Sequence, residues 1–198
     1  MAKQHGPWTI EGSVEKHKDR WVEVREDRVI KPDGEPGKFT SVKLLPGVSV
    51  LALDDEGRAH LTSEFRYAIG CDSIEVVSGA IDDGEEPLAA ARRELREELG
   101  IEAEEWIGLG LVDALTSQLL CPATLFLARN LSFKNPERET TEQIEHLIVP
   151  FDEAVGMVME SRITHAPSCV LILKAGEYLR SHLRSDAALL RGSQAGKE

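Results

Sequence analysis

One segment, residues 79–101, constrains this chain more than any other because it predicts a helix with three acidic side chains on one side. Glu94, Glu97 and Glu98 are three and four residues apart, so they project from the same side of a helix. Leucines at helical spacing predict the buried stripe of this helix, namely Leu88, Leu95 and Leu99. Like charges at this spacing destabilise a helix by roughly 0.2–0.5 kcal/mol per pair, so we expect something positive to offset them.

A hard divalent cation, Mg²⁺ or Mn²⁺, is the partner that three carboxylates favour, because such ions prefer oxygen ligands and substrate phosphates. Gly79 follows a predicted strand and permits close backbone approach to the site. The carbonyl of Ser78 is a candidate for one further oxygen ligand. A solvated helix face is the alternative interpretation, but it does not demand the glycines, Arg93 and the aliphatic residues at their positions.

Composition narrows the class of protein. The chain has 198 residues and a net charge of −12, with no basic stripe, which argues against a nucleic-acid partner. No apolar run approaches the roughly 20 residues that cross a bilayer, and the first residues lack the apolar core of a signal peptide. The three cysteines are far apart and suggest neither a zinc site nor a disulfide framework. We therefore expect a cytoplasmic protein without a membrane partner.

The pattern of apolar runs predicts three regions. Residues 1–41 favour a small β element of two or three strands, residues 42–184 form the main domain, and residues 185–198 are expected to be a flexible tail. Within the main domain, strands alternate with helices near 87–99, 153–161 and 167–183. This order predicts an α/β (α+β) fold in which helices cover a mixed central sheet, an α/β/α sandwich.

Residues 79–101 match the Nudix box, Gly-x5-Glu-x7-Arg-Glu-aliphatic-x-Glu-Glu-x-Gly-aliphatic, at every specified position. The chain therefore resembles the Nudix hydrolases, and the resemblance implies hydrolysis of a nucleoside diphosphate linked to another group. It assigns metal binding and catalysis to Glu94, Glu97 and Glu98. It also implies that Gly79 and Gly100 have structural roles, and that an ion pair joins the loop to the helix, between Glu85 and Arg93.

The surroundings of the box resemble those of ADP-ribose and nucleotide-sugar pyrophosphatases. The aromatic-Arg strand at Phe65-Arg66-Tyr67 leads to a strand that contains Glu75. By this resemblance Arg66 binds the diphosphate bidentately, as arginine does well, and Glu75 belongs to the same substrate site. The resemblance favours ADP-ribose as the small-molecule substrate, with a nucleoside monophosphate and a sugar phosphate as products.

The same resemblance extends to a catalytic base and to a homodimer. The acidic loop that contains Glu139 and Glu142 resembles the one that supplies the base, and Glu142 is the first choice; a solvated loop is the alternative for both residues. Related enzymes are commonly homodimers with N-terminal strands at the interface. By this resemblance, Trp8 or Trp21 stacks on the nucleobase, and Trp21 is the candidate for this role. The alternative is that the tryptophan is buried in the dimer interface.

Two departures leave the substrate open. Residues 115–121 lack the Pro-Gly pair that is usual before the following strand, and Glu64 replaces a common glutamine. Both departures are expected near the sugar-side pocket. GDP-mannose, UDP-glucose, a dinucleoside polyphosphate or coenzyme A are therefore alternative substrates, and a sensor that binds ADP-ribose without cleaving it is the alternative class. His146 and His165 are interpreted as structural or surface residues.

Overall fold

The central strand β5 (Gly47–Leu53) is buried on both of its faces, and each face belongs to a different hydrophobic core. The computed structural model describes residues 2–136 and 143–194, with side chains up to residue 182. Because side chains alternate along a strand, Val48 and Val50 pack on one side while Leu51 and Leu53 pack on the other. Such a strand requires a covering layer on each side.

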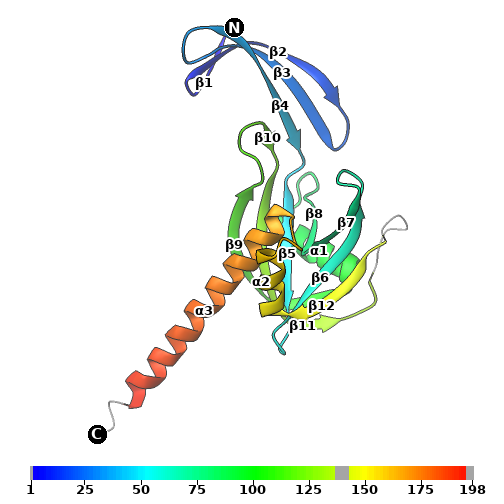
Figure 1. Cartoon of the computed structure of the whole chain (residues 1–198), viewed down its shortest axis with the longest axis vertical. Coiled ribbons are helices and arrows are strands. Elements are labelled where there is room, and N and C mark those ends of the chain that lie inside the picture. The colour runs from blue at the N-terminus through cyan, green and yellow to red at the C-terminus, as the bar shows by residue number, and fades with distance from the viewer. Residues whose placement is uncertain (1, 137–142, 195–198) are drawn as a thin grey trace.

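Six other strands belong to the same sheet as β5. They are β6 (Arg58–Arg66), β7 (Cys71–Glu75), β8 (Val77–Ala80), β9 (Ile101–Asp113), β11 (Pro122–Phe133) and β12 (Glu145–Pro150). Among the described residues they form a seven-stranded sheet whose main path is β12-β6-β5-β11-β9 (Figure 1). β7 pairs with β6, and β8 pairs with β5. β5 and β11 are parallel and the other pairs are antiparallel, so the sheet is mixed as predicted.

Helices cover both faces of this sheet. α1 (Pro87–Leu99) buries Ala91 and Leu95 against the face that carries Val48 and Val50. α2 (Phe151–Met159) and α3 (Ala166–Gln194) pack on the opposite face, where Leu171 joins the core around Leu51. The arrangement confirms the α/β/α sandwich that the sequence predicts.

A second sheet is formed by β1 (Lys3–His5), β2 (Trp8–Lys18), β3 (Val22–Ile30), β4 (Pro36–Leu44) and β10 (Leu119–Leu120), in that order. It projects from one end of the molecule, and α3 projects from the other (Figure 1). The predicted N-terminal element ended near residue 41, but β4 continues to Leu44. It continues because Val42 and Lys43 pair with β3 on one side and with β10 on the other.

The C-terminal helix is longer than predicted. The sequence predicts an end near residue 183 and a tail over 185–198, whereas α3 runs to Gln194. Residues 184–191 are rich in Ala, Leu and Arg, which are good helix formers, so the helix continues where the hydrophobic periodicity fades. In the described part of the chain, no helix is both long and apolar enough to cross a membrane.

Candidate active site

The helix that carries the three glutamates has a defined start and end. α1 begins with Pro87 at its first position, where the missing N–H costs no hydrogen bond. It ends at Gly100, whose φ of 64° is in the left-handed region and whose N–H donates to the carbonyl of Arg96. Gly100 therefore stops the helix as predicted.

Arg93 connects the loop before α1 to the acidic face of the helix. It donates from Nε and Nη2 to the two carboxylate oxygens of Glu85, each at 3.0 Å, and from Nη2 to the carbonyl of Ala80 at 3.0 Å. The predicted ion pair between loop and helix is thus present. Arg93 Nη1 also donates to Glu94 at 2.6 Å and to Glu97 at 3.2 Å, which the sequence reasoning missed.

This network offsets the repulsion within the acidic face. Hydrogen bonding to Glu85, and then to Glu94, raises the pKa of Arg93. In return, the bonds from Arg93 lower the pKa of Glu85. Arg93 therefore supplies part of the positive charge that offsets the repulsion between the glutamates.

The three glutamates line one pocket of about 270 Å³, together with Ser78 and Gly79. Glu98 is only 8% exposed, although charged side chains are rarely buried without compensation. Gly79 lies directly against Glu94, since a Cβ at position 79 would lie 2.0 Å from the carboxylate carbon of Glu94. Only glycine leaves the Glu94 carboxylate at this wall of the pocket.

The donor chemistry of the pocket fits a hard divalent cation. The three carboxylates supply oxygen atoms only, which such ions prefer. Among the residues that the structure describes, no three acidic, histidine or cysteine side chains already converge on one point; Arg93 instead holds Glu94 and Glu97. Arg93 contacts one oxygen of each carboxylate, Oε1 of Glu94 and Oε2 of Glu97, so a cation at this face would share these two side chains with Arg93.

Ser78 lies at the strand end that enters the pocket. Its hydroxyl is used inside the fold, because Oγ is 2.9 Å from Ser49 Oγ and donates to the carbonyl of Val76 at 3.2 Å. The backbone carbonyl of Ser78, which the sequence analysis singled out, remains the candidate ligand at this position.

Arg66 lines the same pocket and is held by two carboxylates. It donates from Nε and Nη2 to Glu75 at 3.2 and 2.9 Å, and its Nη1 is 2.7 Å from Glu64. Burial lowers the pKa of Arg66, but the hydrogen bonds and charge of Glu75 raise it by more. Glu64 also borders the pocket, as expected from its place before the aromatic-Arg strand.

Glu75 lies behind Arg66, and its predicted role in substrate binding stays a prediction. Glu75 is 5% exposed and, within the described part of the chain, does not border the pocket. The antiparallel pairing of β7 with β6 turns its carboxylate toward Arg66 instead. Glu75 therefore orients the arginine from behind.

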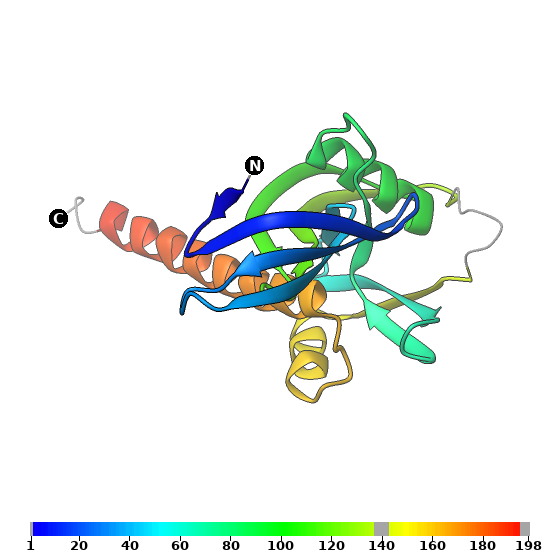
Figure 2. The same ribbon diagram turned by 90° about the horizontal axis from the view of Figure 1, so that it is seen from above.

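Trp21 lies at the mouth of the pocket. It sits at the tip of the β2–β3 hairpin, is 53% exposed, and lines the pocket together with the glutamates of α1; in the view of Figure 2 this tip overlaps α1. Asp19 fixes the tip by accepting from the backbone N–H of Trp21 at 2.7 Å. The guanidinium of Arg20 lies 4.6 Å from the centre of the Trp21 ring, and Arg20 Nη2 is 4.0 Å from Asp82. Arg20 and Asp82, which also line the pocket, were not predicted; the only sequence signal was their place beside Trp21 and in the box.

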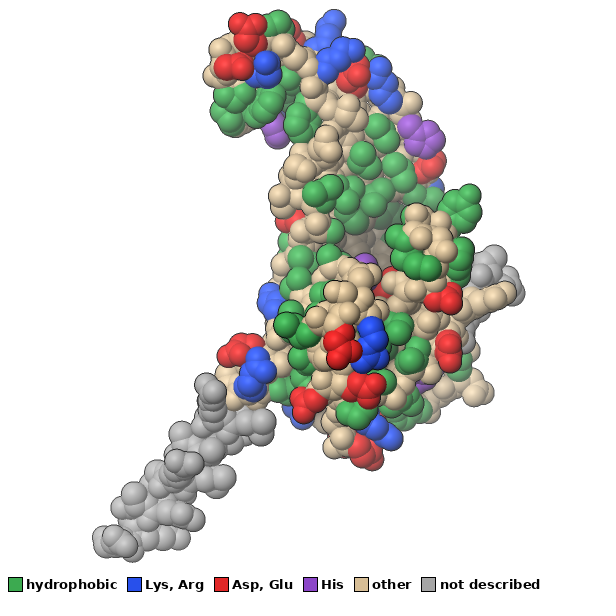
Figure 3. Space-filling model, viewed as in Figure 1, with side chains coloured by type: hydrophobic (Ala, Val, Ile, Leu, Met, Phe, Trp, Pro, Cys, Tyr) green, Lys and Arg blue, Asp and Glu red, His purple; other side chains and the backbone are tan. Residues whose placement is uncertain are grey.

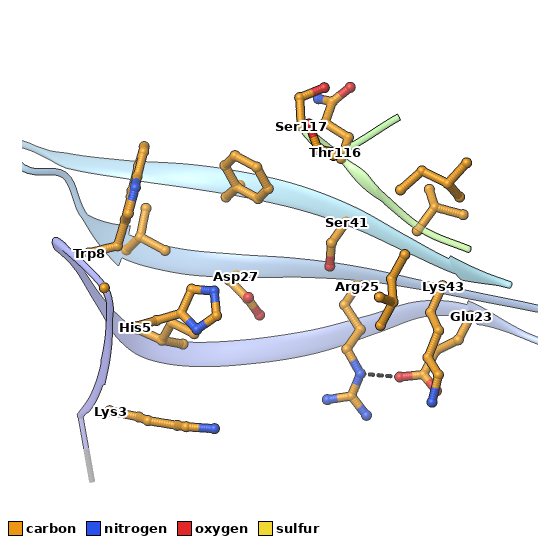
Figure 4. Close-up of a pocket in the computed structure, with 18 of the residues that line it drawn as sticks. Lys3, His5, Trp8, Glu23, Arg25, Asp27, Ser41, Lys43, Thr116 and Ser117 are labelled. Atoms are coloured by element: carbon orange, nitrogen blue, oxygen red, sulfur yellow. Dashed lines mark hydrogen bonds and ion pairs between the residues drawn. The ribbon is translucent and has the colours of Figure 1, made fainter. Parts of the chain in front are cut away.

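Trp8 lies in a different place. Its ring packs edge-on against Phe39 at 5.7 Å, in a groove of about 990 Å³ on the N-terminal sheet. Figure 4 shows side chains that line this groove, among them His5 from β1, Trp8 from β2 and Lys43 from β4. Green apolar side chains gather on the same part of the molecule in Figure 3.

Residues 115–121 are displaced from the position that the sequence suggests. They were expected near the sugar-side pocket, but residues 116–120 line the groove of the N-terminal sheet and, among the described contacts, not the glutamate pocket. The reason is β10: it pairs with β4, and Val42 N–H donates to the carbonyl of Gln118 at 2.8 Å. Glu139 and Glu142 lie outside the described residues, so their role as base stays a prediction.

A family model for the NUDIX domain matches residues 43–167, which is more than half of the chain. The chain belongs to the Nudix family. A second model, for the nucleoside diphosphate sugar hydrolase N-terminal domain, matches residues 8–42 of this Nudix protein. Both matches agree with the resemblance that the box and its flanking strands indicate. Nudix hydrolases generally use divalent metal ions, which agrees with the oxygen donors of the pocket.

Relatives of this Nudix protein carry several names. It is 27% identical over 158 residues to the methanol dehydrogenase activator of Bacillus methanolicus, covering 77% of this chain and 84% of the relative. It is 28% identical over 160 residues to the ADP-ribose pyrophosphatase of Bacillus subtilis (strain 168), covering 76% and 83%. The crystal structure of an ADP compounds hydrolase has the same fold, with a TM-score of 0.79, 18% identity, and coverage of 91% of this chain and 98% of that one.

Proposed function

We propose that this protein hydrolyses the diphosphate of a nucleoside diphosphate sugar, with ADP-ribose as the favoured substrate. The observation that carries the proposal is one pocket that combines the acidic face of α1 with Arg66 and Trp21. Water adds to one phosphorus, the bridging P–O bond breaks, and the products are a nucleoside monophosphate and a sugar phosphate.

The roles of the residues follow from their chemistry. Arg66 has two N–H groups beyond its three bonds to Glu64 and Glu75, and these suit a phosphate oxygen pair. Trp21 offers an exposed ring at the mouth, where a nucleobase can stack. The glutamates of α1 line the same pocket as these two side chains.

We propose Mg²⁺ or Mn²⁺ as the cation and Glu94, Glu97, Glu98 and the Ser78 carbonyl as its ligands. A divalent cation held there would polarise a phosphoryl oxygen and lower the pKa of a bound water molecule. Glu142, or else Glu139, would accept a proton from the attacking water. A protein with a net charge of −12 repels an anionic diphosphate, so the bound cation must offset this repulsion.

Support for a nucleotide sugar comes from the pocket lining and from the relatives. The pocket of about 270 Å³ joins the acidic face of α1 to Arg66, which suits a diphosphate, and to Trp21, which suits a nucleobase. The name of the Bacillus subtilis relative, ADP-ribose pyrophosphatase, favours an ADP-linked sugar.

A substrate panel tests the proposal. ADP-ribose, GDP-mannose, UDP-glucose, a dinucleoside polyphosphate, coenzyme A and free nucleoside triphosphates are incubated with Mg²⁺ or Mn²⁺, and products are identified by ³¹P NMR. We expect turnover of a nucleotide sugar that EDTA abolishes, with ¹⁸O from labelled water in one phosphate product. Binding of ADP-ribose without turnover of any compound would instead support a sensor, and faster turnover of another class would reassign the substrate.

We also propose a homodimer that uses the N-terminal sheet. The groove on this sheet, of about 990 Å³, combines aromatic and aliphatic side chains with Arg25 and Lys43, and a second copy of the chain could cover these apolar side chains. Sedimentation equilibrium should give twice the chain mass of 21.9 kDa, and the chain mass itself would contradict the proposal. The cytoplasmic location stays a proposal of the same kind, which cell fractionation tests.

A further inference from the structure

His165 lies behind the candidate active site, in a position to which the sequence reasoning gave no function. It precedes α3 directly, and its carbonyl accepts from the N–H of Cys169 at 3.0 Å. Its Nδ1 lies 2.9 Å from Ser168 Oγ and 3.4 Å from Glu75 Oε2. Its side chain is 30% exposed, so the ring is largely enclosed.

The Glu75 carboxylate links this histidine to the pocket. Its Oε2 accepts from Arg66 Nη2 at 2.9 Å and also faces His165 Nδ1, while its Oε1 accepts from Arg66 Nε at 3.2 Å. A buried carboxylate is stabilised only when its oxygens have partners on all sides. Arg66 supplies the partners on the pocket side, and His165 supplies the partner on the α3 side.

The histidine is itself fixed to the sheet. Ser168 is fully buried, and its Oγ accepts from the backbone N–H of Val76 at 3.0 Å. Val76 is the residue next to Glu75 in the chain. The first turn of α3 is therefore bonded to the backbone that carries the carboxylate, and the His165 ring cannot shift without disturbing one of these contacts.

The surroundings also select the tautomer of the imidazole. An Nδ1 without a proton would direct its lone pair at the Glu75 carboxylate, whereas Nδ1–H donates to Ser168 Oγ and faces Glu75 Oε2. Burial lowers the pKa of His165, the charge of Glu75 raises it and that of Arg66 lowers it. The neutral ring with its proton on Nδ1 thus prevails near neutral pH.

We propose that His165 is a positioning residue: it holds the Glu75 carboxylate from the α3 side, and Glu75 in turn sets the orientation of the Arg66 guanidinium in the pocket. The link from His165 through Glu75 to Arg66 stands on geometry alone. Its effect on substrate binding rests on the proposed function, because it assumes that Arg66 binds the diphosphate.

Kinetics with ADP-ribose and Mg²⁺ test the effect on binding. We expect His165→Ala to raise KM about two- to tenfold with kcat within about twofold, the net value of one hydrogen bond. His165→Asn should restore KM because its amide N–H can replace Nδ1–H, whereas His165→Gln should not. In an Arg66→Lys background, His165→Ala should have no further effect; a full, additive effect there would overturn the proposal.

A second readout does not depend on activity. The ¹⁵N–¹H signal of Arg66 Nε, identified by its loss in Arg66→Lys, should shift in His165→Ala and return toward its original position in His165→Asn. His182→Asn, on the exposed part of α3, is the matched control and should leave the signal unchanged.

An Arg66 signal that His165→Ala does not move overturns the proposal, even if the protein hydrolyses ADP-ribose. If no nucleotide sugar is hydrolysed, the proposed function fails, whereas the Arg66 signal still tests the link from His165 to Arg66. If His165→Ala does not fold, the comparison of His165→Asn with His165→Gln decides in its place.

Discussion

Gly79 and the carboxylate of Glu94 are in direct contact across the wall of the pocket, so that a Cβ at position 79 would lie 2.0–2.4 Å from the three atoms of that carboxylate. The end of a glutamate side chain is flexible and can move away, whereas the strand backbone cannot. An alanine at position 79 should therefore displace Glu94 and leave the fold intact.

For Gly79→Ala we expect kcat/KM to fall by about ten- to a hundredfold, because a shift of about 1 Å in a positioned group can cost that much. The free energy of unfolding should change by less than about 1 kcal/mol. Gly108→Ala is the matched control, since no atom lies within 4 Å of a Cβ built there. Equal activity of the two variants would argue against a role of Glu94.

Glu98→Gln tests the assignment of the most buried glutamate of the acidic face. The amide keeps the shape of the side chain but removes its charge, so turnover should fall by at least about a hundredfold, as for other groups that stabilise charge in a transition state. Thermal unfolding should change little. Glu104→Gln, on an exposed part of β9, should retain full activity. Near-normal turnover of Glu98→Gln would remove Glu98 from the metal site.

Glu64→Gln tests how far Glu64 limits Arg66. The Glu64 carboxylate lies 2.7 Å from Arg66 Nη1 and competes with a diphosphate for the same guanidinium. Removing its charge should lower the KM for ADP-ribose about two- to fivefold at low salt, and by less at high salt, where such interactions are screened. Glu105→Gln, which alters the pair with Arg129 on another strand, is the control. A higher KM would mean that Glu64 assists binding.

Stability should depend on pH through one buried and one half-buried histidine, His60 and His165. Burial lowers the pKa of His60 and of His165 below their ordinary value of 6.5. The unfolded chain therefore binds more protons than the folded chain just below pH 6.5. The stability that the two neutral rings contribute is complete above that pH and is lost as pH falls toward the folded pKa values. Urea unfolding between pH 5 and 8 measures this.

In the same experiment His165→Asn should reduce the slope of unfolding free energy against pH, and His182→Asn should not. The acidic residues with lowered pKa, such as Asp54 and Glu85, act in a different window, because their contribution is lost only near and below their ordinary values of 3.8 and 4.5. A stability that is constant from pH 7.5 to 5.5 would contradict the burial of the two rings.

Gly100→Ala should destabilise the fold by about 2 kcal/mol or more. The φ of 64° costs a residue with a Cβ about 1–2 kcal/mol, and a Cβ there would lie 2.2 Å from the carbonyl oxygen of Lys134 and 2.8 Å from the backbone nitrogen of Pro136. Gly57→Ala separates the two causes, because Gly57 has a similar φ of 73° with open space around it. Equal losses of unfolding free energy in both variants would leave no role for the backbone contact.

Local pattern was sufficient to predict α1, its end at Gly100 and the Glu85–Arg93 pair, because each depends on residues within about twenty positions of one another. It was insufficient for Glu75. Whether this residue faces the pocket or lies behind Arg66 depends on the pairing of β6 with β7, and sequence spacing does not define that register. The contact of His165 with Glu75 joins positions ninety residues apart in the chain and has no local signal.

The same reason explains why β10 was missed. Two residues, Leu119 and Leu120, are too few to show a strand periodicity, and their partner β4 lies more than seventy residues earlier. Arg20, a residue of the glutamate pocket, lies there only because the β2–β3 hairpin reaches the loop that contains Asp82. Contacts between the two sheets are therefore the part of the site that one sequence predicts least well.

The pairing of β10 with β4 has a consequence for protein engineering. The strands of residues 1–44 are attached to the rest of the molecule through the chain at Leu45 and Pro46 and also through the pairing of β4 with residues 119–120. A loop grafted from a relative in place of residues 114–121 would have to bring a matching β4, or the hairpin that carries Trp21 would change its angle. Chimeras of this protein should therefore exchange residues 1–44 and 114–121 as one unit.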